Sequence, residues 1–220
     1  EGYEATPSFS PDGSRVVFTW AGPDGENEDL YVVGATGEPP QRLTTAPEQD
    51  VSPAWSPDGR EIAFLRGNQQ MESRLMLLDL ASGRERELAA VTGWYGRETR
   101  NLSWSPDGKW LAVLHGGAGS RQSVLRLFSP STGEWREVLN PEKSLEYLEP
   151  AISFDGKYVA YVVDRVVKYG IWVQKLTPDC RPDGAPVMTA PMGSHPAWTP
   201  NGDLLYRSAR AEIGVLARIP

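Results

Sequence analysis

Short apolar segments alternate with polar turns along the whole chain, and this alternation occurs in five repeats. In each repeat one apolar segment precedes a turn centred on Asp-Gly or Asn-Gly, and another follows it. The segments after the turns are Val16–Phe18, Ile62–Phe64, Leu111–Val113, Val159–Tyr161 and Leu204–Tyr206. Runs of this kind, rich in β-branched and aromatic residues and bounded by Gly and Pro, predict β-strands.

The turns give the repeat its period. Their Asp or Asn positions recur every 46 to 49 residues, a spacing typical of repeat architectures. In Ser-Pro-Asp-Gly the Pro fixes φ at the second position of a type I turn, and the Gly accepts a positive φ at the fourth. We therefore give a structural role to the turn residues Asp12, Gly13, Asp58, Gly59, Asp107, Gly108, Asp155, Gly156, Asn201 and Gly202.

Further strands follow in each repeat. Third strands are expected at Leu30–Val33, Leu75–Asp79, Val124–Phe128, Ile171–Lys175 and Ile213–Arg218, and fourth strands at Gln41–Thr44, Arg84–Leu88 and Trp135–Leu139. A four-stranded antiparallel sheet cannot bury both faces alone, and a ring of such blades solves this. The sequence predicts one all-β propeller domain over residues 1–220, with blades near 5–50, 51–99, 100–148, 149–194 and 195–220.

The last of these blades is incomplete, because the chain ends on its third strand and only Glu1–Ala5 precede the first strand. We expect either part of a six-bladed ring or a five-bladed ring with imperfect closure. An open ring would expose an unpaired strand edge and an apolar sheet face, and both favour self-association. The start at Glu1, without a leader, fits a processed mature chain, a trimmed chain or an excised fragment.

Composition excludes several classes of partner. The chain has 22 Lys and Arg against 29 Asp and Glu, a net charge of −7, and no basic patch, so nucleic acid and anionic membrane surfaces are not expected partners. The longest apolar run, Val159–Val163, is too short for a membrane-spanning helix. Cys180 is the only cysteine, which excludes an internal disulfide.

Catalytic and metal motifs are missing from the sequence. No Gly-x-Ser-x-Gly elbow is present, and the two histidines, His115 and His195, are too few for a metal site in the channel. We expect His115 to be a half-buried strand residue. An acidic loop lacks the ligand spacing of a calcium loop and is predicted to be solvated; it contains Asp24, Glu26, Glu28 and Asp29. The sequence therefore predicts no enzyme activity, no catalytic residue, no metal and no cofactor.

A candidate binding surface lies at the start of the inner strands, at the mouth of the central channel. Counting back six residues from each turn Asp or Asn gives Thr6, Ser52, Asn101, Glu149 and His195, and close to them are Glu4, Asp50, Arg100 and Tyr147. These residues are polar or amphipathic where a buried strand would be apolar. The alternative is that any propeller channel is wet and lined by polar groups. The loops Ala21–Asp29, Gly67–Ser73 and Gly116–Gln122 vary in length and sequence, as specificity loops on a constant scaffold do.

Two segments show a family resemblance. Gly2–Gly13 and Ser52–Gly59, with Asp29–Val32 and Gln41–Thr44, resemble the TolB-type, WD40-like β-propeller repeat of bacterial proteins. The likeness covers essentially the whole chain, although Phe154 replaces the turn Pro in repeat four and Asn201 the turn Asp in repeat five. It implies a six-bladed periplasmic adaptor that contacts a peptidoglycan-associated lipoprotein.

The same repeat also occurs in proteins of other classes. It forms sensor propellers attached to bacterial regulators or kinases, which would be cytoplasmic, and the gating propellers of prolyl-oligopeptidase-type peptidases. A repeat that serves several functions identifies the fold better than the activity. From the sequence we expect a non-enzymatic scaffold that binds a protein or peptide at the channel mouth, with those two accessory roles as alternatives.

Overall fold

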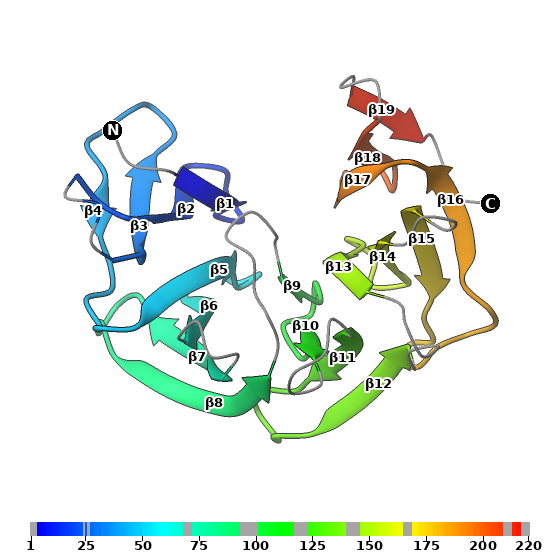
Figure 1. Ribbon diagram of the computed structural model, residues 1–220, viewed down its shortest axis with the longest axis horizontal. Helices are drawn as coiled ribbons and strands as arrows, with labels where there is room; N and C mark the ends of the chain where they lie inside the picture. The colour runs from blue at the N-terminus through cyan, green and yellow to red at the C-terminus, as the bar shows by residue number, and fades with distance from the viewer. Residues whose placement is uncertain are drawn as a thin grey trace. The chain divides into compact units, whose positions relative to one another are not determined.

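The structure is a computed structural model, and it describes residues 4–23, 25, 27–67, 72–92, 101–116, 123–139, 146–164, 169–208 and 213–216. The fold is an all-β propeller with four four-stranded antiparallel blades and a partial fifth sheet (Figure 1). The chain divides into two compact units, residues 1–102 and 103–220. No helix in the described ranges is long and apolar enough to cross a membrane.

The first unit contains two complete blades. The first blade is β1 (Glu4–Phe9), β2 (Arg15–Trp20), β3 (Asp29–Gly34) and β4 (Gln41–Arg42), and the second is β5 (Gln49–Trp55), β6 (Glu61–Gly67), β7 (Glu72–Asp79) and β8 (Glu85–Thr92). In both blades the strands follow one another in the order of the sequence. The boundary between the units falls inside β9 (Leu102–Trp104), the first strand of the third blade.

The second unit contains the other sheets. The third blade continues with β10 (Leu111–Gly116), β11 (Ser123–Phe128) and β12 (Trp135–Leu139), and the fourth is β13 (Glu146–Ile152), β14 (Tyr158–Asp164), β15 (Gly170–Lys175) and β16 (Val187–Pro191). The partial sheet has β17 (Ser194–Trp198), β18 (Leu204–Arg207) and β19 (Ile213–Leu216). Most of the predicted strand residues are confirmed. However, β4 ends at Arg42, before the expected Thr44, and β8 runs beyond the expected Leu88 because its residues pair along the whole of β7. The last two residues of the expected strand Ile213–Arg218 lie outside the described residues.

The turns between the first two strands of each blade have the predicted geometry. The Gly13 N–H donates to the Ser10 carbonyl oxygen at 2.8 Å, and φ of Gly13 is +69°. The Ser10 hydroxyl donates to Asp12 Oδ1 at 2.6 Å and accepts the Arg15 N–H at 2.9 Å. The same backbone bond closes the other four turns, including the one at Asn201. The turn Asp therefore has a structural role, as the sequence predicted.

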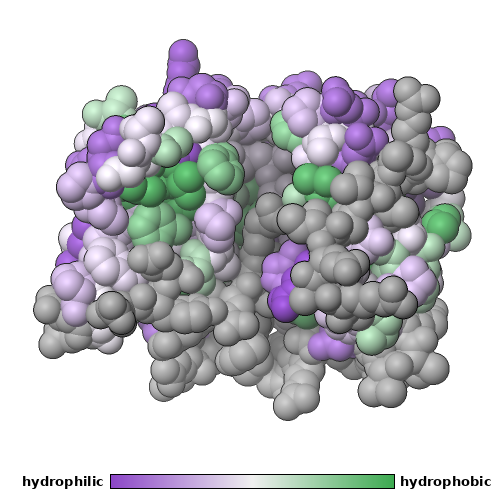
Figure 2. All heavy atoms as spheres, turned by 90° about the horizontal axis from the view of Figure 1, so that it is seen from above, coloured by the Kyte–Doolittle hydropathy of each residue, from purple (hydrophilic) through white to green (hydrophobic). Residues whose placement is uncertain are grey.

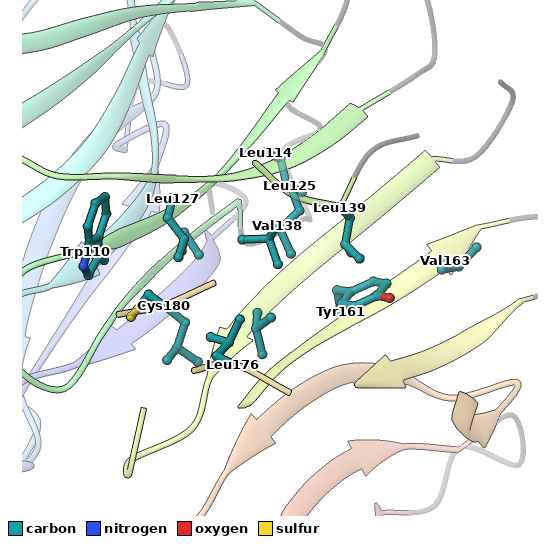
Figure 3. Packing of buried hydrophobic residues seen from close by; sticks show 13 residues of the cluster. Trp110, Leu114, Leu125, Leu127, Val138, Leu139, Tyr161, Val163, Leu176 and Cys180 are labelled. Carbon is teal, nitrogen blue, oxygen red and sulfur yellow. The ribbon is translucent and has the colours of Figure 1, made fainter. Parts of the chain in front are cut away.

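Face-to-face packing of the blades forms the core of each unit. In the first unit Val17, Leu30 and Val32 of the first blade pack against one face of the second, which presents Trp55, Ile62, Phe64, Met76 and Leu78. In the second unit, side chains of β10–β12 point toward those of β14 (Figure 3), and Tyr161 is among the largest fully buried residues there. Cys180 is buried in the same cluster. Because both faces of a blade are apolar, each blade needs a neighbour on each side.

Hydrogen bonds between neighbouring blades recur at one position of the repeat. The Trp55 N–H donates to Ser8 Oγ at 3.1 Å in the first unit, and the Ile152 N–H donates to Ser103 Oγ at 3.0 Å in the second. Where the equivalent residue is Ala151, its carbonyl oxygen accepts the indole N–H of Trp198 at 2.9 Å. Each bond joins the residue four positions before the turn Asp of one blade to the residue three positions before the turn Asp or Asn of the next blade. These bonds therefore also fix how the two neighbouring blades align.

The bond to Ser8 gives a stability prediction. In Ser8→Ala the buried Trp55 N–H loses its acceptor, and we expect the free energy of unfolding to fall by about 1 kcal/mol. Thr45→Ala, which removes an exposed hydroxyl from the same unit, should change it by less than about 0.5 kcal/mol. Urea unfolding followed by tryptophan fluorescence measures both. Equal stability of the two variants would show that the hydroxyl contributes nothing to blade packing.

The turns also predict a pH dependence. Hydrogen bonds from the Ser10 hydroxyl and from Ser14 lower the pKa of Asp12 to about 2, below the value of about 3.9 in an unfolded chain. A carboxyl whose folded pKa is lowered stabilises the fold above its unfolded pKa, and this contribution disappears as the pH falls. Asn201 shows that an amide fits the turn. The stability difference between the native chain and Asp12→Asn should shrink between about pH 4 and pH 2 in urea titrations, and a difference independent of pH would contradict the assignment.

Candidate functional site

Four inner strands contain a β-bulge at the same point of the repeat. The strand register shifts between Ala5 and Ser8, Val51 and Ala54, Leu148 and Ala151, and Ser194 and Ala197. In each bulge one residue has a positive φ and the next residue is Pro. The positive-φ residues are Thr6 (50°), Ser52 (55°), Glu149 (54°) and His195 (56°). Four of the five positions that counting back from the turns had selected are therefore bulge residues.

Proline explains why the strands are irregular here. It has no N–H to donate, so within a sheet it is confined to edges, strand ends and bulges. A non-glycine residue at positive φ costs on the order of 1–3 kcal/mol and persists only where its surroundings hold it. Bulges often redirect side chains near functional sites. The signal that could have predicted these bulges is the polar-residue–Pro pair repeated at Pro7, Pro53, Pro150 and Pro196.

The third repeat departs from this pattern. Asn101 is followed by Leu102 instead of Pro, and Asn101 is not among the residues with positive φ. Its inner strand β9 is only three residues long. The Asn101 side chain nevertheless contacts the neighbouring blade, since Nδ2 donates to Ser52 Oγ at 2.9 Å. A side-chain bond thus joins the equivalent positions of two repeats.

In the first unit the predicted polar residues are buried. Thr6, Ser52 and Asn101 are 8%, 0% and 2% exposed. The Thr6 and Thr19 hydroxyl oxygens lie 3.1 Å apart and share a hydrogen bond. Buried polar groups need such partners, because an unsatisfied one costs about 1–3 kcal/mol. These side chains are used inside the fold, where the sequence had suggested a surface open to a partner.

Asp50 differs most from the expectation. It is fully buried and accepts two hydrogen bonds from Arg66, at 2.7 and 2.8 Å, while Arg66 also contacts Glu85 at 2.6 Å. Hydrogen bonding to Asp50 raises the pKa of Arg66, so the guanidinium stays charged. Burial raises the pKa of Asp50, and the bonds from Arg66 oppose that effect. We assign this ion pair to structure, since removing one partner of a buried pair leaves an uncompensated charge.

Two residues of the predicted acidic loop are buried. Glu28 and Asp29 are 4% and 1% exposed, so the prediction of a solvated loop is wrong for these two residues. Asp29 accepts a hydrogen bond from Arg42 at 2.5 Å and another from Thr44 at 3.3 Å. Burial raises the pKa of Asp29, and the Arg42 bond opposes this. The other two acidic residues, Asp24 and Glu26, lie outside the described residues.

In the second unit, Glu149 and His195 join the fourth blade to the partial sheet. The backbone N–H of His195 donates to Glu149 Oε2 at 2.7 Å, and its ring Nε2 lies 3.3 Å from Oε1. Ser194 Oγ lies 3.0 Å from the other ring nitrogen, Nδ1. The Glu149 side chain is 7% exposed and that of His195 is 54% exposed. Among the predicted site residues whose side chains are described, only His195 presents a largely exposed side chain.

The remaining predicted residues add little to this site. Glu4 and Tyr147 lie in β1 and β13, but their side chains, like the whole of Arg100, fall outside the described residues. Most of the loops Gly67–Ser73 and Gly116–Gln122 does too. His115 lies in β10, half-buried beside the Trp135 ring at 5.8 Å, as predicted, and burial lowers its pKa. No group of three or more potential metal ligands occurs in the described part of the chain.

Repeated four-stranded antiparallel blades with a bulged inner strand define a β-propeller. A family model described as TolB beta propeller domain matches residues 1–144. The chain therefore belongs to the TolB β-propeller domain family, which confirms the resemblance seen in its turns.

Relatives of known name fall into two kinds. The chain is 30% identical over 158 residues to the uncharacterized peptidase YuxL of Bacillus subtilis (strain 168), which is 70% of this chain and 21% of YuxL. It is 47% identical over 47 residues to the Tol-Pal system protein TolB of Anaeromyxobacter dehalogenans, which is 21% of this chain and 10% of that protein. Both matches span a small part of the relative.

A solved structure agrees on the fold. TolB from Acinetobacter baumannii superposes with a TM-score of 0.73 at 19% identity, covering 92% of this chain and 49% of that one. Identity this low shows a common fold and nothing more specific. The chain thus spans about half of that TolB chain.

The Glu149–His195 contact gives a prediction for this site. In Glu149→Ala the His195 N–H loses a charged acceptor, and we expect the unfolding free energy to fall by about 2 kcal/mol. Glu149→Gln keeps an acceptor oxygen and should cost less. Glu137→Ala removes an exposed carboxylate paired with Arg126 and should change stability by less than about 1 kcal/mol. Urea unfolding measures all three, and equal losses for Ala and Gln at position 149 would contradict the role of the carboxyl oxygen.

Proposed function

We propose that this chain is a non-enzymatic binding module that recognises a protein or peptide through the bulged ends of its inner strands. The observation that supports this best is the exposed imidazole of His195, held by its backbone bond to the buried Glu149. An exposed polar side chain on a backbone that is already fixed suits recognition, because little conformational entropy is lost when a partner binds. Glu149, the bulge residue of the fourth blade, contributes by fixing the backbone of His195.

The partner we propose comes from the family. The family match and the Tol-Pal system relative favour a periplasmic adaptor whose partner is a peptidoglycan-associated lipoprotein. The net charge of −7 agrees with a protein partner better than with nucleic acid. This proposal places the chain in the periplasm of a bacterium.

A second function is favoured by the match to YuxL, which aligns over 158 residues. YuxL is named a peptidase, and the aligned residues make up 70% of this chain but only 21% of YuxL. If the parent protein is a peptidase, this chain is its accessory propeller and controls access to a catalytic domain elsewhere in the protein. The two functions differ in where the partner is, on another protein or in the same one.

A binding experiment tests the first function. We expect the soluble domain of a peptidoglycan-associated lipoprotein to bind the chain in isothermal titration calorimetry, and His195→Asn to weaken binding about tenfold, a typical effect of a moderate interface contact. Asn tolerates positive φ, so the backbone of the bulge is kept. Phe154→Ala is the matched control, because Phe154 is 57% exposed on a turn after β13.

The opposite outcomes are informative. No heat of binding with the folded chain would overturn the adaptor function. Peptide hydrolysis by the product of the complete reading frame, with larger substrates accepted when residues 1–220 are removed, would establish the accessory propeller of a peptidase. Equal weakening by His195→Asn and Phe154→Ala would show that His195 is not part of the contact.

A further inference from the structure

The two faces of a blade are chemically different, and every described packing of one blade on another joins one face of each kind. We call one side of a blade its incoming face; it contains the residue three positions before the turn Asp or Asn, such as Trp55. We call the other side its onward face; it contains the residue four positions before the turn Asp or Asn, such as Ser8. Incoming faces are rich in aromatic and large aliphatic residues. Onward faces have small or aliphatic residues such as Val17, Ala112 and Ala160.

The incoming face of the first blade is uncovered at Phe9 and Val16, whereas Phe18 and Tyr31 on the same face are each 8% exposed. Phe9 is 66% exposed, whereas its equivalents Trp55, Ile152 and Trp198 are 6%, 9% and 9% exposed. Val16 is also half-buried, although its equivalents in the second and fourth blades, Ile62 and Val159, are fully buried. Figure 2 shows hydrophobic residues gathered on its left, the side where Figure 1 draws β1–β4.

Aromatic packing gives this face a defined shape. The Trp20 and Tyr31 rings meet edge-on with centroids 4.8 Å apart, and Phe18 lies 6.3 Å from Tyr31. The register places Phe9 beside Val16, and Val16 opposite Val33. These six aromatic or β-branched side chains on one sheet face form the kind of surface that the incoming faces of the other blades bury.

The onward face of the partial fifth sheet is also uncovered in part, at Leu205 and Ala197. Leu205 is half-buried, whereas the equivalent residues Val17, Ala112 and Ala160 are fully buried. Ala197, paired with Leu205, is half-buried too, while the equivalent Ala151 is 5% exposed. One chain therefore has one uncovered face of each kind, and these are the kinds that pack together within each unit.

We propose that a second copy of this chain covers the first blade: the onward face of its fifth sheet packs on Phe9 and Val16. The contact joins two different surfaces, so it is head-to-tail. Burial of exposed apolar surface drives the association.

Sedimentation equilibrium over a wide range of protein concentration tests the proposal. We expect the average mass to rise with concentration. Phe9→Asp should weaken the association at least about tenfold to a hundredfold, the range expected for removing one large apolar side chain from a buried contact. Leu205→Asp should have a similar effect from the other face. Phe154→Asp, on an equally exposed phenylalanine outside both faces, should leave the association unchanged.

Mixing the two defective variants distinguishes a head-to-tail contact from any other. Phe9→Asp keeps an intact onward face on its fifth sheet, and Leu205→Asp keeps an intact incoming face on its first blade. The mixture should therefore form a one-to-one heterodimer at concentrations where each variant alone is largely monomeric. If circular dichroism shows that Leu205→Asp is unfolded, Ala197→Glu on the same face replaces it. A mixture that stays monomeric at those concentrations, or single variants that associate as strongly as the native chain, would overturn the proposal.

A native chain that stays monomeric at every concentration would also overturn the proposal. The unfolding free energy of Phe9→Asp would then show what covers Phe9. If Phe9→Asp lowers the unfolding free energy of that monomer, the chain's own fifth sheet covers Phe9. If stability is unchanged, the face is free in this chain, and a further repeat of a longer protein becomes the candidate. Binding of the lipoprotein depends on His195 and is measured separately, so either proposal can fail without the other.

Discussion

A blade with two apolar faces cannot be stable alone, and this constraint governs the rest of the structure. Within each unit, neighbouring sheets bury apolar faces against each other, through clusters such as the one around Phe64 in the first unit and Tyr161 in the second. Stability then comes largely from interfaces between neighbours, as in other repeat proteins. The bonds from Trp55 to Ser8 and from Ile152 to Ser103 give those interfaces a fixed register.

The same constraint explains why the bulges are tolerated. A positive φ at Thr6, Ser52, Glu149 or His195 costs free energy, which the paired strands and the packed faces on both sides of the inner strand offset. Polar partners are needed at the same points, because the bulges place the Thr6 and Ser52 hydroxyls and the Glu149 carboxylate where water has little access. The Asn101–Ser52 and Glu149–His195 contacts meet that need with different chemistry, one neutral and one charged.

The sequence was sufficient to predict the strands, the turns and the family, because each depends on a local pattern that repeats. Ser-Pro-Asp-Gly specifies its turn by itself, and Trp135–Leu139 was predicted to the residue. The candidate site was predicted less well. Counting back from the turns found the bulge positions, but it could not show that Asp50 would be buried against Arg66 or that Glu28 and Asp29 would be enclosed, since these depend on residues distant in sequence.

Residues that repeat in every blade maintain the fold, so residues that break the repeat are better candidates for function. The turn Asp and the inner-strand Pro occur in most blades and have structural partners in each. By contrast, the contact between Glu149 and His195 is the one contact between equivalent bulge positions, among the described residues, in which both side chains are ionisable. A family member that keeps the turns but has other residues at these two positions would be expected to keep the fold and to change its partner.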